Sequence, residues 1–188
     1  MYEGYDGLIF DMDGTILDTE PTHRKAWDVV LTRYGLSFDE RTVTGLNGSP
    51  TWRIAEVIIA SQQSNLDPMV LAAEKTAVLR EILFDTVQPL ALVEVVKAYK
   101  GRRPMAVGTG SEHAMAEALL QHLGLRDYFD AIVGADDVTR HKPEPDTFLR
   151  CAELIKVAPT RCVVFEDADF GIQAAQAAGM DFVDVRLL

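Results

Sequence analysis

Five short strand-like segments, most of them apolar, are separated from one another by helical patterns and limit most strongly what this chain can fold into. The first run is Gly7–Phe10, and the others lie at 104–109, 130–133, 162–165 and 181–185. Short apolar runs are typical of buried strands. Strands that alternate with helices form parallel sheets with right-handed crossovers. The sequence therefore predicts an α/β fold built on a parallel sheet.

Residues from about 18 to 86 show helical patterns and no strand signal. In the first of these, Trp27, Val30, Leu31 and Tyr34 recur at helical spacing, and Gly35 is placed to end the helix. Further helices are predicted at 51–60 and 68–83, and the polar segment that ends at 45–50 is interpreted as a loop. We expect two parts: a core at 1–17 and 87–188, and a helical block at 18–86 inserted after the first strand.

Composition excludes several classes of partner. The chain has 188 residues and a net charge of −11, which argues against a surface for nucleic acid or anionic membrane. No apolar run approaches the length of a membrane span, and the acidic N-terminus does not resemble a signal peptide. Cys151 and Cys162 are most simply core thiols of a reducing compartment. We expect a cytoplasmic protein and, by default, a monomer.

Chemically useful side chains follow four of the predicted strands or lie in the loops beyond them. Asp11 and Asp13 follow the first strand, and if the chain stays extended, both project to one side. The remaining groups are Thr109 with Gly110 and Ser111, Lys142, and Glu166 with Asp167. In a parallel sheet these loops share one edge, where ligands bind. We therefore expect the groups to converge.

Their chemistry is that of phosphoryl transfer through a carboxylate. Asp11 and Asp167, with a backbone carbonyl near Asp13, are hard oxygen ligands suited to Mg²⁺. Lys142 supplies a compact cation for a phosphoryl group, and Thr109 leads into a helix N-terminus that favours an anion. Asp11 can then attack phosphorus and Asp13 can transfer protons. We expect Mg²⁺ and Lys142 to keep Asp11 anionic, which leaves Asp13 as the proton donor.

Four motifs, in order, resemble those of the haloacid dehalogenase superfamily. They are DMDGT, the threonine after an apolar strand, K-P-x-P-D, and F-E-D-A-x-x-G-I-x-A-A, and they cover the chain from Asp11 to about Gly179. D-x-D-G and a threonine at a strand end are weak signals individually, whereas the ordered set is highly specific. The helical block resembles the small cap of the β-phosphoglucomutase-like sugar phosphatases within this superfamily.

The resemblance implies a Rossmann-like core and a Mg²⁺-dependent phosphatase that forms an aspartyl phosphate. Asp11 is then the nucleophile and Asp13 the acid/base, with Thr109, Gly110 and Lys142 on the phosphoryl group. Asp11, Asp13 and Asp167 hold the metal, with Glu166 behind them or as an alternative ligand. Small sugar phosphates of the fructose 1-phosphate or 6-phosphogluconate type are the implied substrates. Three cap residues can face the substrate, although solvated side chains are as consistent with the sequence: His23, Asn47 and Lys75.

Two other functions use similar residues. A β-phosphoglucomutase on the same scaffold needs a second phosphate site in the cap, but Gly48 takes the place of the arginine that such mutases use, and Arg53 is the nearest basic residue. Thr15 also matches the common phosphatase form. A non-enzymatic phospho-acceptor of the receiver type is disfavoured, because its acidic pair precedes the phosphorylated aspartate along the chain. Hydrolysis is therefore the predicted activity.

Overall fold

The computed structural model describes residues 1–46 and 49–188, and a five-stranded parallel sheet lies at its centre. The strand order is β5-β4-β1-β6-β7. The strands are β1 (Gly7–Phe10), β4 (Met105–Gly108), β5 (Ala131–Val133), β6 (Cys162–Glu166) and β7 (Asp181–Asp184). The predicted α/β fold with a Rossmann-like parallel sheet is confirmed, because all four strand pairs are parallel.

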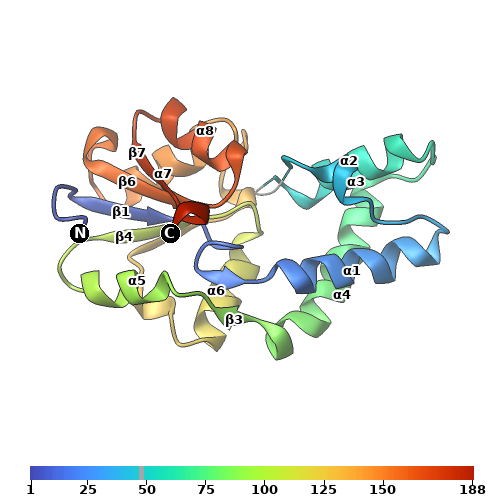
Figure 1. Ribbon diagram of the computed structural model, residues 1–188, viewed down its shortest axis with the longest axis horizontal. Helices are drawn as coiled ribbons and strands as arrows, with labels where there is room; N and C mark the ends of the chain where they lie inside the picture. The colour runs from blue at the N-terminus through green and yellow to red at the C-terminus, as the bar shows by residue number, and fades with distance from the viewer. Residues whose placement is uncertain (47–48) are drawn as a thin grey trace.

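Helices cover both faces of this sheet (Figure 1). Leu8 and Phe10 of β1 belong to a core with α5 (Val93–Tyr99) and α6 (His113–His122). Ile9, which points the other way, belongs to a second core with α7 (Asp146–Leu154) and α8 (Asp169–Ala177). A strand buried on both faces is continuously apolar, which explains the short runs in the sequence. Single 3-10 turns complete this part: η1 (Arg126–Tyr128), η2 (Ala135–Asp137), η3 (Pro159–Arg161) and η4 (Val185–Leu187).

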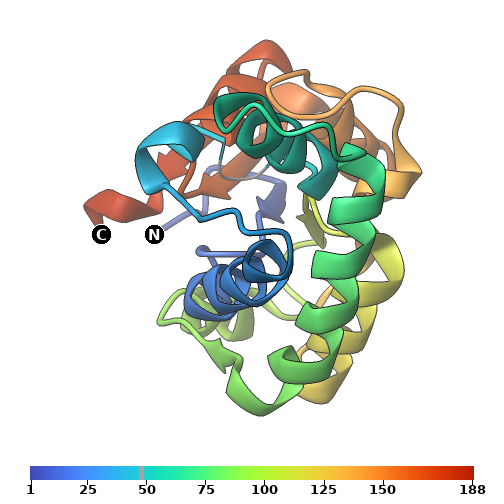
Figure 2. The same ribbon diagram turned by 90° about the vertical axis from the view of Figure 1, so that its right-hand side faces the viewer.

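Four helices lie to one side of the sheet and are in front in Figure 2. They are α1 (Glu20–Arg33), α2 (Glu40–Val43), α3 (Thr51–Ser61) and α4 (Pro68–Thr86), and α4 packs against both α1 and α3. Two short antiparallel strands, β2 (Leu17–Asp18) and β3 (Gln88–Pro89), connect them to the rest of the chain. No helix in the part of the chain that is described combines the length and apolar character of a membrane span.

Two details differ from the sequence-based expectation. The segment interpreted as a loop contains α2, whose first turn is capped by the side chain of Asp39, which accepts a hydrogen bond from the Arg41 amide at 3.0 Å. Four residues are too few to show a helical period, so only this cap could have revealed the turn. The block expected to be wholly helical also begins in β2, since Asp18 pairs with Gln88.

Candidate active site

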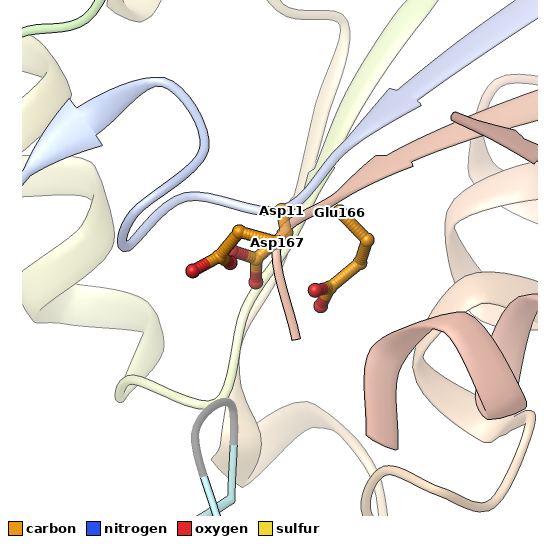
Figure 3. A group of neighbouring side chains, drawn as sticks. All are labelled: Asp11, Glu166 and Asp167. Carbon is orange, nitrogen blue, oxygen red and sulfur yellow. The ribbon is translucent and has the colours of Figure 1, made fainter. Parts of the chain in front are cut away.

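Three carboxylates meet at the ends of the two central strands. Asp11 directly follows β1, and its amide donates to the carbonyl of Phe165 in β6 at 2.9 Å. Glu166 ends β6 and Asp167 follows it, so the central pairing of β1 with β6 places the three acids together. One carboxylate oxygen of each lies within 4.8 Å of the others, and Figure 3 shows the three side chains gathered at the ends of the two strands. Asp11 and Glu166 are buried, and such crowding of charge requires cations nearby.

Lys142 supplies one cation from the loop before α7. Its Nζ donates to Asp11 Oδ1 and to Glu166 Oε1, both at 2.7 Å, and its side chain is 1% exposed. Burial opposes its charge, but Asp11 and Glu166 outweigh burial and raise the pKa of Lys142. The second oxygen of Glu166 accepts from the Ala168 amide at 2.7 Å. Both oxygens of Glu166 are thus occupied, and its carboxylate holds Lys142 beside Asp11.

Asp13 lies in a different environment from Asp11, because β1 ends at Phe10 and the chain then turns. The Gly14 φ of +81° makes this turn, and a Cβ atom there would lie 2.3 Å from Asp167 Oδ2. Asp13 accepts hydrogen bonds from Thr19 Oγ1 at 2.6 Å, Ser111 Oγ at 3.0 Å and Thr109 Oγ1 at 3.3 Å. The predicted loop after β4 is therefore beside Asp13, and Gly110 lines the same pocket.

Of the three residues suggested in the helical block, His23 contacts Asp13 and Lys75 contacts His23. His23 Nε2 lies 3.3 Å from Asp13 Oδ1, and Lys75 Nζ lies 2.6 Å from His23 Nδ1. A protonated lysine can only donate, so Nδ1 accepts and Nε2 carries the proton that faces Asp13. Lys75 is 2% exposed, and burial lowers its pKa to about 8. Asn47, the third residue, lies outside the described residues.

The two aspartates titrate in the opposite order from our expectation when no metal is present. Burial and the neighbouring Glu166 raise the pKa of Asp11 to about 7, although Lys142 acts against this. Burial also disfavours the charged form of Asp13, but hydrogen bonds from His23, Thr19 and Ser111 outweigh it and lower the pKa of Asp13. The expected order assumed a divalent ion beside Asp11. Lys142 alone does not offset two neighbouring acids.

The donor set at the strand ends fits a hard divalent cation. Burial and the charge of Asp11 raise the pKa of Asp167 to about 7, so the acids repel one another here. Oxygen-only carboxylate ligands match Mg²⁺, which is bound by one or two carboxylates plus phosphate and water. Glu166 accepts hydrogen bonds from Lys142 and the Ala168 amide, and Asp11 accepts from Lys142 and Thr15, whereas the side-chain donor to Asp167 is Thr15 Oγ1.

Several supporting residues were not assigned a role from the sequence. Thr15 Oγ1 lies 3.1 Å from Asp11 Oδ2 and 3.2 Å from Asp167 Oδ1, so it joins two loops. A Cβ atom on Gly171 would lie 1.8 Å from Glu166 Oε1, so only glycine leaves room for that carboxylate. Thr15 lies in the DMDGT motif and Gly171 in the F-E-D-A-x-x-G motif, so the sequence did indicate that both belong to the site. Ser111 was named with the Thr109 loop, but the hydrogen bonds of Ser111 and Thr19 to Asp13 could not be read from the sequence, because they depend on how the chain turns after β1 and β4.

Comparison with known proteins shows the family to which this chain belongs. The family "Hydrolase: haloacid dehalogenase-like hydrolase" matches residues 5–179, and the chain belongs to this family. It is 70% identical over 188 residues, all of both chains, to the fructose-1-phosphate phosphatase YqaB of Escherichia coli (strain K12). It is 31% identical to the phosphorylated carbohydrates phosphatase of Thermotoga maritima, covering 94% of this chain and 82% of that protein.

A solved structure supports the same relationship. The crystal structure of β-phosphoglucomutase from Clostridium difficile superposes with a TM-score of 0.83 at 26% identity, covering 95% of this chain and 83% of that one. The predicted resemblance to the haloacid dehalogenase superfamily is thereby confirmed, and so is its hydrolase class.

Proposed function

We propose that this protein is a Mg²⁺-dependent phosphatase that hydrolyses small sugar phosphates through an aspartyl phosphate, with fructose 1-phosphate as a substrate. One observation carries the proposal: two aspartates two residues apart have different partners. Asp11 faces Lys142 and Asp167, whereas Asp13 faces Thr109, Ser111 and His23. The 70% identity to YqaB supports the choice of substrate.

In the first step, an oxygen of Asp11 attacks phosphorus and the bond to the sugar oxygen breaks. Lys142 and the groups around Thr109 stabilise the charge on the phosphoryl oxygens. Asp13 gives a proton to the departing alkoxide. Its hydrogen bonds favour the anion, so protonation requires the substrate to displace at least one of them. His23 is the one imidazole among these donors, and it comes from α1 of the helical block.

In the second step, water attacks the phosphorus of the aspartyl phosphate and the bond to Asp11 breaks. Asp13 is now the anion that its surroundings favour, and it accepts the proton from the attacking water. Asp11, Asp167 and the backbone carbonyl of Asp13 would hold Mg²⁺, which when bound would supply positive charge for the phosphate and lower the pKa of Asp11. The metal assignments, like the roles of Thr109, Gly110 and Lys142, are part of this proposal.

Residues 18–86 act in this proposal as a cap over a core of 1–17 and 87–188. The cap contacts the core through two pairs of side chains. Arg80 of α4 donates to Glu112 before α6 at 2.8 Å, and the Arg53 guanidinium lies over the Phe170 ring at 5.8 Å. Closure of the cap would exclude bulk water. Both cysteines are buried and free, which is consistent with a cytoplasmic location, and we propose a monomer.

A β-phosphoglucomutase is the second candidate, because a mutase structure superposes well on this chain. A mutase must also hold a distal phosphate in the cap. Arg53, the basic residue suggested for that role, packs on Phe170 and is not among the residues that line the pocket at Asp11. Gly48 lies outside the described residues. Hydrolysis is favoured.

Phosphate release from fructose 1-phosphate, 6-phosphogluconate and β-glucose 1-phosphate, with Mg²⁺ and with a chelator, tests the proposal. We expect metal-dependent release of free phosphate and the free sugar. Asp11→Asn should abolish turnover and keep the fold, because a carboxamide cannot attack phosphorus. Rapid formation of glucose 6-phosphate with little free phosphate would favour the mutase, and turnover by Asp11→Asn near the wild-type rate would refute the covalent mechanism.

A further inference from the structure

Helix α1 directs one stripe of side chains into the pocket that contains Asp11. Glu20, His23, Arg24 and Trp27 all line this pocket, and they recur at the i, i+3, i+4 and i+7 positions of one helix face. His23 contacts Asp13, and Trp27 is 3% exposed and packed in the core. The mechanism above gives no role to Glu20 or Arg24.

Glu20 offers a hydrogen-bond acceptor, and the neighbouring Arg24 offers hydrogen-bond donors. Glu20 has no ion pair or hydrogen-bond partner among the side chains of residues 1–46 and 49–188. Arg24 pairs with Glu40 of α2, and its guanidinium lies 5.9 Å from the centre of the Phe38 ring. About half of the Arg24 side chain is exposed, so its remaining N–H groups are accessible. Residues four apart on a helix are neighbours.

We propose that Glu20 and Arg24 bind adjacent hydroxyl groups of the leaving group and so select polyhydroxylated phosphates. This inference rests on the proposed phosphatase function. With the phosphate at Asp11 and Lys142, on the sheet side of the pocket, the carbon chain of the substrate extends toward the α1 side. A carboxylate accepts hydrogen bonds from hydroxyls and a guanidinium donates to them, so a neighbouring pair matches a diol.

The opposite side of the pocket offers a further polar group. Ser49, in the loop before α3, is 7% exposed and lines the pocket, and its Oγ has no hydrogen-bond partner among the described residues. An unpartnered buried hydroxyl is costly, and a substrate hydroxyl would satisfy it. Trp27 and Phe38 also line this pocket and give it an apolar part, suited to the C–H groups of a sugar.

Steady-state kinetics of Glu20→Ala and Arg24→Ala test the proposal with two substrates. Fructose 1-phosphate carries adjacent hydroxyls, whereas p-nitrophenyl phosphate carries none. Because hydrogen bonds to charged groups are the stronger kind, we expect kcat/KM for fructose 1-phosphate to fall about tenfold in each variant. The value for p-nitrophenyl phosphate should stay within about twofold, because the chemistry at Asp11 is unchanged.

Glu40→Ala is the matched control for Arg24→Ala, since it breaks the same ion pair and keeps the guanidinium. It should retain the wild-type preference for fructose 1-phosphate. An equal loss on both substrates, a Glu40→Ala variant that behaves like Arg24→Ala, or unchanged kinetics would overturn the assignment. A wild-type protein that hydrolyses p-nitrophenyl phosphate but no sugar phosphate would overturn the proposed function itself.

Discussion

At the scale of single residues, Asp13 is distinguished from Asp11 by the hydroxyl and imidazole donors around it. Asp13→Asn preserves the size of the side chain but cannot move a proton. We expect fructose 1-phosphate turnover to fall by about 10²–10⁴, the usual contribution of general acid–base catalysis. An activated aryl phosphate should lose less, because its leaving group needs no proton. The measurement is the rate of the wild type and of Asp13→Asn on both substrates, with one preparation of each protein.

Equal losses on the two substrates would contradict proton transfer by Asp13. Equal losses would instead give Asp13 a structural role, because it accepts hydrogen bonds from the hydroxyls of Thr109 and Ser111 and so holds their loop. Circular dichroism and the melting temperature of Asp13→Asn show whether the variant has lost structure or has lost only proton transfer.

Gly171 gives a prediction about packing behind the site. Gly171→Ala puts a methyl group where Glu166 Oε1 now lies, at 1.8 Å, so the carboxylate that holds Lys142 must move. We expect about 1–3 kcal/mol of destabilisation, as for other overpacked cores, with at least about a tenfold loss of kcat/KM. Urea unfolding and the kinetic assay measure the two effects.

Gln173→Ala is the control, because this side chain is exposed on the same helix. It should change stability by less than about 0.5 kcal/mol and leave activity unaltered. If Gly171→Ala behaves like Gln173→Ala, then Glu166 is not confined by α8 as the structure indicates.

At the scale of elements, the sequence predicted the sheet well because four of its five strands are buried along their whole length, and only the edge strand β7 is partly exposed. The runs at 7–10 and 162–165 then have no polar residue to obscure them, and β1 and β6 begin at the predicted residues. The helix α2 was missed because four residues show no period. The contacts of Asp13 with Thr19 and His23 could not be predicted, because they depend on how α1 leaves the sheet.

The helical block gives a prediction about substrate size. Arg80–Glu112 and Arg53–Phe170 join it to the sheet region in two places, and its helices contribute side chains to the pocket that contains Asp11. A phosphate on a folded protein could reach Asp11 only if the helical block moved away from the sheet. We therefore expect kcat/KM for a folded phosphoprotein to be at least about 10³-fold below that for fructose 1-phosphate, in line with lids that sequester small substrates.

Phosphate release from phosphorylated casein-like peptides and from an intact phosphoprotein checks this expectation. Efficient release from the folded phosphoprotein would show that these helices do not confine the substrate. Arg80→Ala should not raise activity on the peptides or on the phosphoprotein, because an exposed ion pair contributes no more than about 1 kcal/mol.

At the scale of the whole molecule, a net charge of −11 is unusual for a protein with an anionic substrate. The cations that matter are therefore local. Lys142 and Lys75 are buried, and Arg24 lines the pocket. Even so, three carboxylates lie beside the single cation of Lys142 at the strand ends. This excess of negative charge affects the stability of the fold when no metal is bound.

The pKa of both Asp11 and Asp167 is about 7 in the folded protein without metal, well above the unfolded value near 4. Between these values the folded state binds more protons than the unfolded state, so the free energy of unfolding falls as pH rises. In a chelator, we expect the melting temperature to fall between about pH 5 and about pH 7. Mg²⁺ should restore it most at the higher pH, because the ion binds the ionised carboxylates and stabilises the folded state.

Asp167→Asn provides the control for this pH dependence. Removal of one of the crowded carboxylates eliminates its own titration and relieves the repulsion on Asp11. The fall in melting temperature between about pH 5 and about pH 7 should therefore be smaller in Asp167→Asn than in the wild type, and Mg²⁺ should stabilise the variant less. Scanning calorimetry of both proteins, with chelator and with Mg²⁺, measures this. A wild-type melting temperature in chelator that rises over this interval would show that Lys142 already balances the acids, so the metal is not needed to keep them together.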